Sequence, residues 1–267
     1  MTTPRVHRVA ERGFGSVADV YERTRPGYPR EVVDLLADEF GLDESKTVVD
    51  LGAGTGKFTR ELTATGARVI AVEPVAEMRA QLTAAVPAAE AVAGTAEAIP
   101  LPEASADLVT AATSFHWFYL DRALPEIHRV LRPDGGLAVL WNTRDDSRRW
   151  VADVQRVIEV AVRTHLSAED VAEAERLRSE RWRAAFAETD LFTRLEEHEF
   201  RHEHEATVDD HIARFLSISF VAALPDEHRG RVLADIERIL RSDPETRGRE
   251  RFGLPYITEV YVGRRRP

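Results

Sequence analysis

The sequence predicts an α/β protein with a Rossmann-like, mostly parallel seven-stranded sheet, helices on both faces, and a helical cap from the N-terminus and the C-terminal half. Short apolar runs rich in β-branched residues alternate with amphipathic stretches over the first half. A glycine cluster at residues 52–56 joins the first of these runs to the stretch that follows it. Beyond about residue 145 longer, more highly charged helical patterns dominate. Because strands and helices alternate with short links, the strands should be parallel, with right-handed crossovers.

The first half predicts five strands and three helices. The run at 47–51 is β-branched and stops at the glycine cluster, which is typical of a buried strand that ends in a tight turn. A helix is expected to stop before Pro133 and the two glycines that follow it. The expected strands are 47–51, 68–72, 91–93, 107–113 and 137–141, and the expected helices are 57–65, 75–85 and 120–131.

The second half predicts four helices and two strands, which we interpret as a cap on the ligand face together with the last strands of the sheet. The helices are expected at 150–165, 168–186, 209–217 and 226–241, and the extended segments at 192–205 and 256–262. We therefore expect a single domain over 1–267, with its core at about 30–145, cap elements at about 1–29, 146–190 and 206–250, and last strands at about 191–205 and 256–264.

Composition and charge narrow the classes of function. Hydrophobic residues make up 43% and charged residues 31% of the chain, the balance of a protein with a packed core. The formal charge of −10 and the lack of a basic stretch beyond Arg264–Arg266 argue against a nucleic-acid partner. There is no cysteine, which excludes disulfides, thiolate catalysis and cysteine-based zinc sites. With no apolar run long enough to span a membrane and no signal-like start, we expect a cytoplasmic monomer or homodimer without a membrane partner.

The strongest motif is Asp50-Leu51-Gly52-Ala53-Gly54-Thr55-Gly56, which follows a strand and opens a helix. Such glycines let the backbone turn tightly and approach a ligand closely. Glu73 follows at the end of the second strand, where a carboxylate can accept hydrogen bonds from a ribose diol. The dinucleotide fingerprint needs glycine where this chain has Lys57, and the phosphate-binding loop fails because Phe58 follows that lysine. An NAD-dependent oxidoreductase is therefore a weak alternative.

The order and spacing of several motifs resemble the class I S-adenosylmethionine-dependent methyltransferases, in the branch called methyltransferase type 11. The resemblance covers about residues 11–145, with further familiar pieces at 141–145 and 254–258. It rests on residues 21–29 and 48–56, on Val72-Glu73-Pro74, and on residues 94–100, 114–118 and 126–136.

The resemblance implies that S-adenosylmethionine is the cofactor, with S-adenosylhomocysteine as its product. The glycines would pass under its methionine and ribose parts, and Glu73 would hold the ribose hydroxyls. Arg25 could pair with the methionine carboxylate, since a guanidinium binds carboxylates bidentately. Many members of this family have Asp in place of Thr95, so Glu97 would contact the adenine amino group instead. The implied cofactor-binding residues are Tyr21, Arg25, Asp50, Gly52, Ala53, Gly54, Gly56, Glu73, Pro74, Met78, Thr95, Ala96, Glu97 and Ser114.

The segment 114–119 ends the fourth strand and should face the ligand crevice. His116 is the candidate catalytic base because histidine titrates near neutral pH; it could equally serve only to hold the loop. Trp117 there, and Trp141, Asn142 and Arg144 at the end of the fifth strand, are candidate acceptor contacts, and Arg144 would suit an acidic acceptor. Positioning can contribute about 7–11 kcal/mol and a general base about 3–5 kcal/mol, so placement of the acceptor should dominate.

Three histidines, His198, His202 and His204, alternate along a predicted strand and so point to one face. Imidazoles in this arrangement could bind a metal. A solvated polar face explains them more simply, and we expect no metal. The sequence as a whole predicts an enzyme that transfers a methyl group to a small-molecule acceptor by in-line displacement. Two alternatives stay open: a cyclisation or elimination at the sulfonium, and a cofactor-binding protein with a non-catalytic regulatory role.

Overall fold

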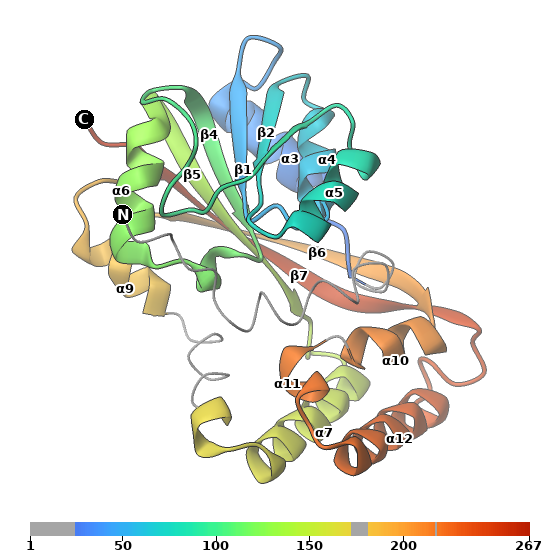
Figure 1. The fold of residues 1–267 in the computed structure, drawn as a ribbon. Coiled ribbons are helices and arrows are strands. Elements are labelled where there is room, and N and C mark those ends of the chain that lie inside the picture. Colours follow the sequence, from blue (N-terminus) through green and yellow to red (C-terminus); the bar gives the residue numbers. More distant parts are fainter. Residues whose placement is uncertain (1–24, 172–180, 217) are drawn as a thin grey trace.

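The computed structural model describes residues 25–171, 181–216 and 218–267, so Tyr21 lies outside the described residues. Its sheet has seven strands in the order β3-β2-β1-β4-β5-β7-β6 (Figure 1). The first five strands pair in parallel, whereas β7 pairs antiparallel with both β5 and β6. The predicted mostly parallel α/β fold is thereby confirmed. The strands are β1 (Thr47–Leu51), β2 (Arg68–Val72), β3 (Glu90–Val92), β4 (Ala106–Ala112), β5 (Leu131–Arg144), β6 (Glu196–Thr207) and β7 (Arg251–Arg264).

Helices cover both faces of the parallel part of the sheet, which is why β1 is buried along its whole length. On one face lie α3 (Arg30–Phe40) and α4 (Lys57–Thr63), whose buried side chains share a core with alternate residues of β1, β2, β4 and β5. Because neighbouring residues of a strand point to opposite faces, Val48 belongs to this core and Val49 to the other. Between β2 and β3, α5 (Ala76–Ala85) lies at the edge of the sheet (Figure 1).

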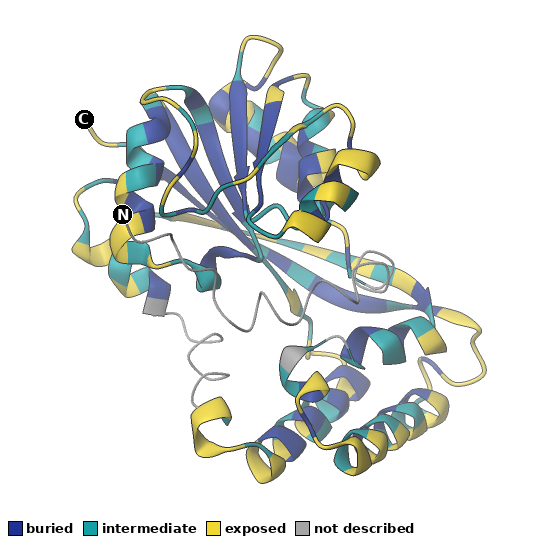
Figure 2. Ribbon diagram, viewed as in Figure 1, coloured by how far each residue is buried: buried dark blue, intermediate teal, exposed yellow. Residues whose placement is uncertain are grey.

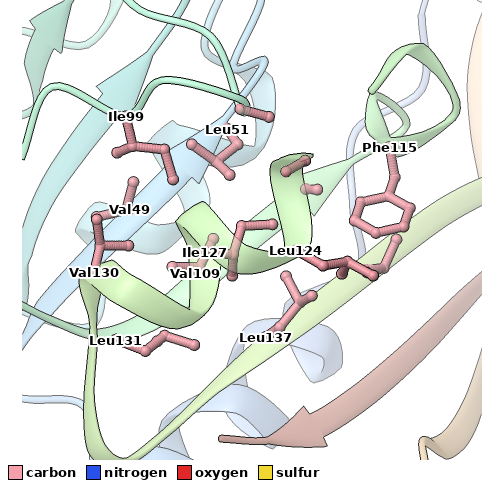
Figure 3. Close-up of a cluster of buried hydrophobic side chains, with 14 of the residues drawn as sticks. Val49, Leu51, Ile99, Val109, Phe115, Leu124, Ile127, Val130, Leu131 and Leu137 are labelled. Carbon is pink, nitrogen blue, oxygen red and sulfur yellow. The ribbon is translucent and has the colours of Figure 1, made fainter. Parts of the chain in front are cut away.

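The opposite face carries α6 (Leu120–Val130) and α9 (Arg181–Glu188). Figure 3 shows Leu124 and Ile127 of α6 against residues of the central strands. We expected the helix at 168–186 to belong to the cap. The described part of that segment, α9, instead packs Trp182 and Phe186 into the core of the sheet, beside Phe115.

The cap is formed by α7 (Arg149–His165), α10 (Val208–Leu216), α11 (Ser219–Ala222) and α12 (Asp226–Ser242). These helices surround a core of their own, which includes Trp150, Phe215 and Ile236. The far ends of the long strands β6 and β7 extend to this cluster, and Phe252 of β7 packs inside it (Figure 1). Figure 2 shows the buried faces of these helices turned toward one another and the exposed faces turned outward. The cap is thus fastened to the sheet through antiparallel strands.

Most predicted elements lie within a few residues of their observed bounds, but three helices were missed: α3, α11 and the short 3-10 helix η1 (Phe115–Trp117). Strands β5 and β7 are also longer than expected. They pair with each other from Gly136↔Arg264 to Arg144↔Tyr256, and β7 reaches back to Arg251 through its pairing with β6. Among the residues that the structure describes, no helix has both the length and the apolar character needed to cross a membrane.

Candidate active site

A pocket opens at the carboxyl ends of the parallel strands, where the loops after β1, β2, β3 and β4 meet the segment 25–28 and the cap. This is the place where open α/β sheets bind ligands. Most of the predicted site residues line it: Arg25, Asp50, Gly52, Ala53, Gly54, Glu73, Pro74, Met78, Thr95, Ala96, Glu97, Ser114 and Trp117.

The glycine loop after β1 forms one wall of the pocket. Gly52, Gly54 and Gly56 have φ values of 63°, 59° and 88°, a region that side chains disfavour. A Cβ on Gly52 would lie 2.7 Å from the Cβ of Ser114, whereas a Cβ on Gly54 would meet nothing within 4 Å. The backbone at Gly54 therefore borders open space in the pocket, and a ligand can approach it closely.

Gly56 differs from the other two because it does not line the pocket. A Cβ on it would lie 2.9 Å from Cγ of Leu82 and 3.0 Å from Cγ2 of Val86. The structure thus provides a packing reason for this glycine: it lets the start of α4 lie against the end of α5.

Glu73 ties the end of β2 to the glycine loop. Its Oε2 accepts a hydrogen bond from the backbone N–H of Gly54 at 2.9 Å, and its Oε1 accepts one from the N–H of Val75 at 2.8 Å. The side chain is 4% exposed, and this burial raises the pKa of its carboxyl. Each carboxylate oxygen offers two acceptor sites, so Glu73 can still receive hydroxyl donors from the pocket.

Asp50 joins three elements beneath the pocket. Its two oxygens accept hydrogen bonds from the hydroxyls of Thr59 on α4, at 2.7 Å, and Thr110 on β4, at 2.8 Å. Burial raises the pKa of Asp50 to about 6, because these two bonds only partly offset the loss of water around the charge. This carboxyl therefore fixes the first turn of α4 relative to the strands.

Two further contacts shape the pocket around the loop after β3. Glu97 accepts a hydrogen bond from the backbone N–H of Tyr119 at 2.8 Å, which joins this loop to the segment after β4. Ala96 and Met78 are 4% and 5% exposed, so both contribute an apolar wall and also fill the core. Packing and ligand contact are compatible for Met78.

The N-terminal segment is held across the pocket by hydrogen bonds to the strand ends. Tyr28 Oη lies 2.9 Å from Oγ1 of Thr113, the residue that follows β4. The Asn142 amide on β5 donates to the carbonyl of Gly27 at 2.9 Å. These bonds place Arg25 in the pocket lining.

Besides Gly56, three predicted residues do not line the pocket: His116, Trp141 and Arg144. His116 lies on η1 with its ring 4.8 Å from that of Trp117. Trp141 stacks on Trp182 at 4.6 Å and packs into the core of the sheet. Arg144 donates to Gln155 and lies 5.7 Å from the ring of Phe215. This placement gives no support to acceptor contacts from Trp141 and Arg144, which face the core and the cap.

Sequence reasoning missed several lining residues, among them Tyr28, Lys57 and Arg214, whereas Asn142 was expected to contact the acceptor and does line the pocket. Lys57 could have been found, because it directly follows the glycine loop and begins α4. Arg214 carried no local signal. It lies on α10 in the cap and is 6% exposed. Its side chain lines the pocket because the long antiparallel strands place the cap beside the pocket.

The three histidines of β6 alternate as predicted, but they are not on a solvated face. His198, His202 and His204 lie on the half-buried side of the strand together with Phe200, and Glu199, Arg201 and Glu203 on the other side are exposed. Burial lowers the pKa of His204 to about 4, and His202 Nε2 lies 3.3 Å from Oδ1 of Asn142. In the described ranges no three His, Asp or Glu side chains are grouped so that they could hold a metal ion.

Comparisons with known proteins point to one family. Residues 49–139 match a family model described as a methyltransferase domain. An uncharacterised methyltransferase-like protein of Schizosaccharomyces pombe is 35% identical over 252 residues, covering 94% of this chain and 94% of its own. An uncharacterised methyltransferase of Mycobacterium tuberculosis is 36% identical over 245 residues, covering 92% of each chain. A solved structure from Anaeromyxobacter dehalogenans, provisionally described as a type II methyltransferase, has a TM-score of 0.65 and 25% identity, covering 91% of this chain and 97% of its own.

Proposed function

The chain belongs to the class I S-adenosylmethionine-dependent methyltransferases, and from that premise we propose that it methylates a small molecule bound in the pocket beside the cofactor. The observation that carries the proposal is the glycine loop at the pocket wall, held by the buried carboxylate of Glu73 through the N–H of Gly54 at 2.9 Å. The proposed reaction is an in-line displacement that depends mainly on how the acceptor is positioned.

The chemistry of the lining residues fits S-adenosylmethionine. Glu73 can accept from two ribose hydroxyls while it keeps its bonds to the loop. Gly54 leaves open space where a side chain would block the ligand. Met78 and Ala96 offer an apolar wall suited to the adenine ring, and Arg25 offers a guanidinium suited to the methionine carboxylate. When bound, this cofactor supplies an electrophilic methyl group on a positively charged sulfur.

The protein's own contribution is to bind, orient and exclude water. Trp117, Phe118 and Tyr119 line one side of the pocket, and bulky rings there displace solvent from the reacting atoms. Holding the acceptor in line contributes about 7–11 kcal/mol, more than the roughly 3–5 kcal/mol of a general base. Since His116 does not line the pocket, we propose that it positions the loop next to Trp117.

The proposal is tested first by ligand binding. S-adenosylmethionine and S-adenosylhomocysteine should each raise the melting temperature, because they bind only the folded protein. At a concentration about 100 times Kd the expected stabilisation is about 2.7 kcal/mol. NADH, which the displaced glycine disfavours, serves as the negative control. Failure of both adenosyl compounds to stabilise the protein would refute the proposal.

The second test identifies the reaction. S-adenosylmethionine with a deuterated methyl group is incubated with the protein and a small-molecule panel, and the products are analysed by mass spectrometry. Methyl transfer predicts S-adenosylhomocysteine together with an acceptor that carries the labelled methyl group. Methylthioadenosine or a cyclised product without a labelled acceptor would establish a different reaction at the sulfonium. His116→Asn should retain more than about one-hundredth of the turnover if His116 only positions the loop, whereas a loss of about 10²–10⁴ marks a base.

A further inference from the structure

We infer that the acceptor carries an anionic oxygen group, a carboxylate or a phosphate, and that Arg214 of the cap and Lys57 of α4 bind it; this inference rests on the proposed function. Both side chains line the pocket that holds the glycine loop. They come from elements that enclose the pocket from different sides, α10 and the first turn of α4.

Arg214 is the more informative of the two. It lies on α10 of the cap, it is 6% exposed, and its side chain reaches the pocket. A guanidinium carries five N–H donors in a planar fork, and it binds planar oxygen anions through two parallel hydrogen bonds. An arginine in the wall of a pocket is therefore suited to a carboxylate or phosphate ligand.

The charges in the pocket are separated. The acids Asp50, Glu73 and Glu97 lie at the ends of β1 and β2 and on the loop after β3, where the adenosine is proposed to bind. The cation Arg214 lies on α10 of the cap and Lys57 lies at the start of α4, and both act on the charge of His204 near the end of β6 that leads into the cap.

The pKa of His204 on β6 is lowered by burial and also by the positive charges of Lys57 and Arg214. Burial is the largest cause of its lowered pKa, and the charges of His211, Lys57 and Arg214 lower it further. Lys57 and Arg214 therefore act on one region at the cap side of the pocket, next to the strand that carries His204. An imidazole there stays neutral near pH 7 and adds no charge of its own.

The cofactor makes this charge pattern selective. Arg25 is proposed to pair with the methionine carboxylate, so that negative charge does not require Lys57 or Arg214. A sulfonium adds a further positive charge near the acceptor. A cationic acceptor, such as a protonated amine, would then face repulsion from Lys57, Arg214 and the sulfonium, whereas an oxygen anion is attracted by all three.

The test uses the full-length protein saturated with S-adenosylhomocysteine and matched pairs of ligands, measured by calorimetry. The pairs are short aliphatic and aromatic carboxylic acids with their primary amides, and phosphate monoesters with their parent alcohols; primary amines form a separate set. At least one acid or phosphate should bind about tenfold or more tightly than its neutral partner, which corresponds to about 1.4 kcal/mol. Whichever pair shows the preference identifies the source of the anion.

Arg214→Gln should reduce that preference to less than about threefold and leave the affinity for S-adenosylhomocysteine within about threefold of the wild type. Arg214→Lys should retain part of the preference, since it keeps the charge and loses the planar fork. If Arg214→Gln does not fold, Lys57→Gln provides the same measurement from the other side of the pocket. The matched control is Arg238→Gln, because Arg238 lies on α12 with a side chain that is 69% exposed and pairs with Asp235.

Three results would overturn the inference: equal or tighter binding of amides, alcohols or amines; no binding of any acid or phosphate to the saturated wild type; or an unchanged preference in the Arg214 and Lys57 variants. Each of these results can be told apart from failure of the proposed function. If the proposed function is wrong, the wild type does not bind S-adenosylhomocysteine at all, and a calorimetric titration with that compound alone shows it.

Discussion

Gly54→Ala should mainly weaken ligand binding and Gly56→Ala should mainly lower stability, although the two glycines lie in the same loop. Both have positive φ, 59° and 88°, so either substitution costs about 1–2 kcal/mol of backbone strain. At Gly56 the new methyl also overlaps Leu82 and Val86, at 2.9 and 3.0 Å, which adds about 1–3 kcal/mol. At Gly54 the methyl meets nothing within 4 Å and projects into the pocket, so the overlap falls on the ligand.

The expected magnitudes follow from these contacts. Gly56→Ala should lower the free energy of unfolding by about 2–5 kcal/mol, or roughly 4–20 °C in melting temperature for a chain of this size. Gly54→Ala should lower it by only about 1–2 kcal/mol. It should weaken binding of S-adenosylhomocysteine by about 1–3 kcal/mol, roughly 5- to 150-fold in Kd. Gly56→Ala, once folded, should bind within about fivefold of the wild type.

The assay combines urea unfolding with calorimetric titration at a temperature where both variants are folded. Gly230→Ala is the control, because Gly230 lies on α12 in open space and alanine there should be neutral or stabilising by about 0.5–1 kcal/mol. The reasoning is refuted if Gly54→Ala keeps wild-type affinity, or if Gly56→Ala keeps wild-type stability and loses binding.

Three further predictions concern the floor and the walls of the pocket. Glu73→Gln replaces one of the two acceptor oxygens with an NH2 group, which then faces a backbone N–H that it cannot accept from. The free energy of unfolding should therefore fall by about 1–3 kcal/mol, and the affinity for S-adenosylhomocysteine should fall more than about tenfold. The control Glu77→Gln, at an exposed position, should change neither quantity in the same titrations. Burial raises the pKa of Asp50 from 3.8 to about 6 in the folded protein, so between these pH values the folded state binds more protons than the unfolded state. The ionised Asp50 therefore lowers the free energy of unfolding as pH rises through this range, by up to roughly 3 kcal/mol. Asp50→Asn should therefore gain stability relative to the wild type between pH 4 and 7 in urea unfolding, and a constant difference would contradict this. Trp141→Ala removes a ring stacked at 4.6 Å in the core and should cost about 3 kcal/mol with cofactor binding unchanged; normal stability with lost turnover would instead support the prediction that Trp141 contacts the acceptor.

Much of the fold could be predicted from local sequence. The bounds of β1 and β2 match their predicted ranges, since each is a short β-branched run that stops at a turn. The glycine loop, Glu73 and the segment 95–97 were assigned to one site and do line one pocket. This works because the loops that follow parallel strands all emerge at the same edge of the sheet.

The prediction failed where long-range pairing decided the outcome. Strand β5 extends to Arg144 where it pairs with β7, and β7 extends back to Arg251 where it pairs with β6, so both run past the apolar runs from which they were predicted. Gly56 shares the spacing of a ligand-binding glycine, yet its neighbours come from α5. The local sequence does not distinguish Arg144 from Arg214 as a candidate for the pocket. The packing of the cap against the sheet places Arg144 against Gln155 and Arg214 in the pocket.

The sequence by itself determined the parallel strands of the sheet, the glycine loop and the family, because these depend on short motifs and on periodic patterns that are local in the chain. The tertiary structure alone decided which side chains of the cap line the pocket. That choice depends on where the helices of the cap lie, and the cap is positioned by strands more than a hundred residues from the glycine loop, through hydrogen bonds and packing that leave no periodic trace in the chain.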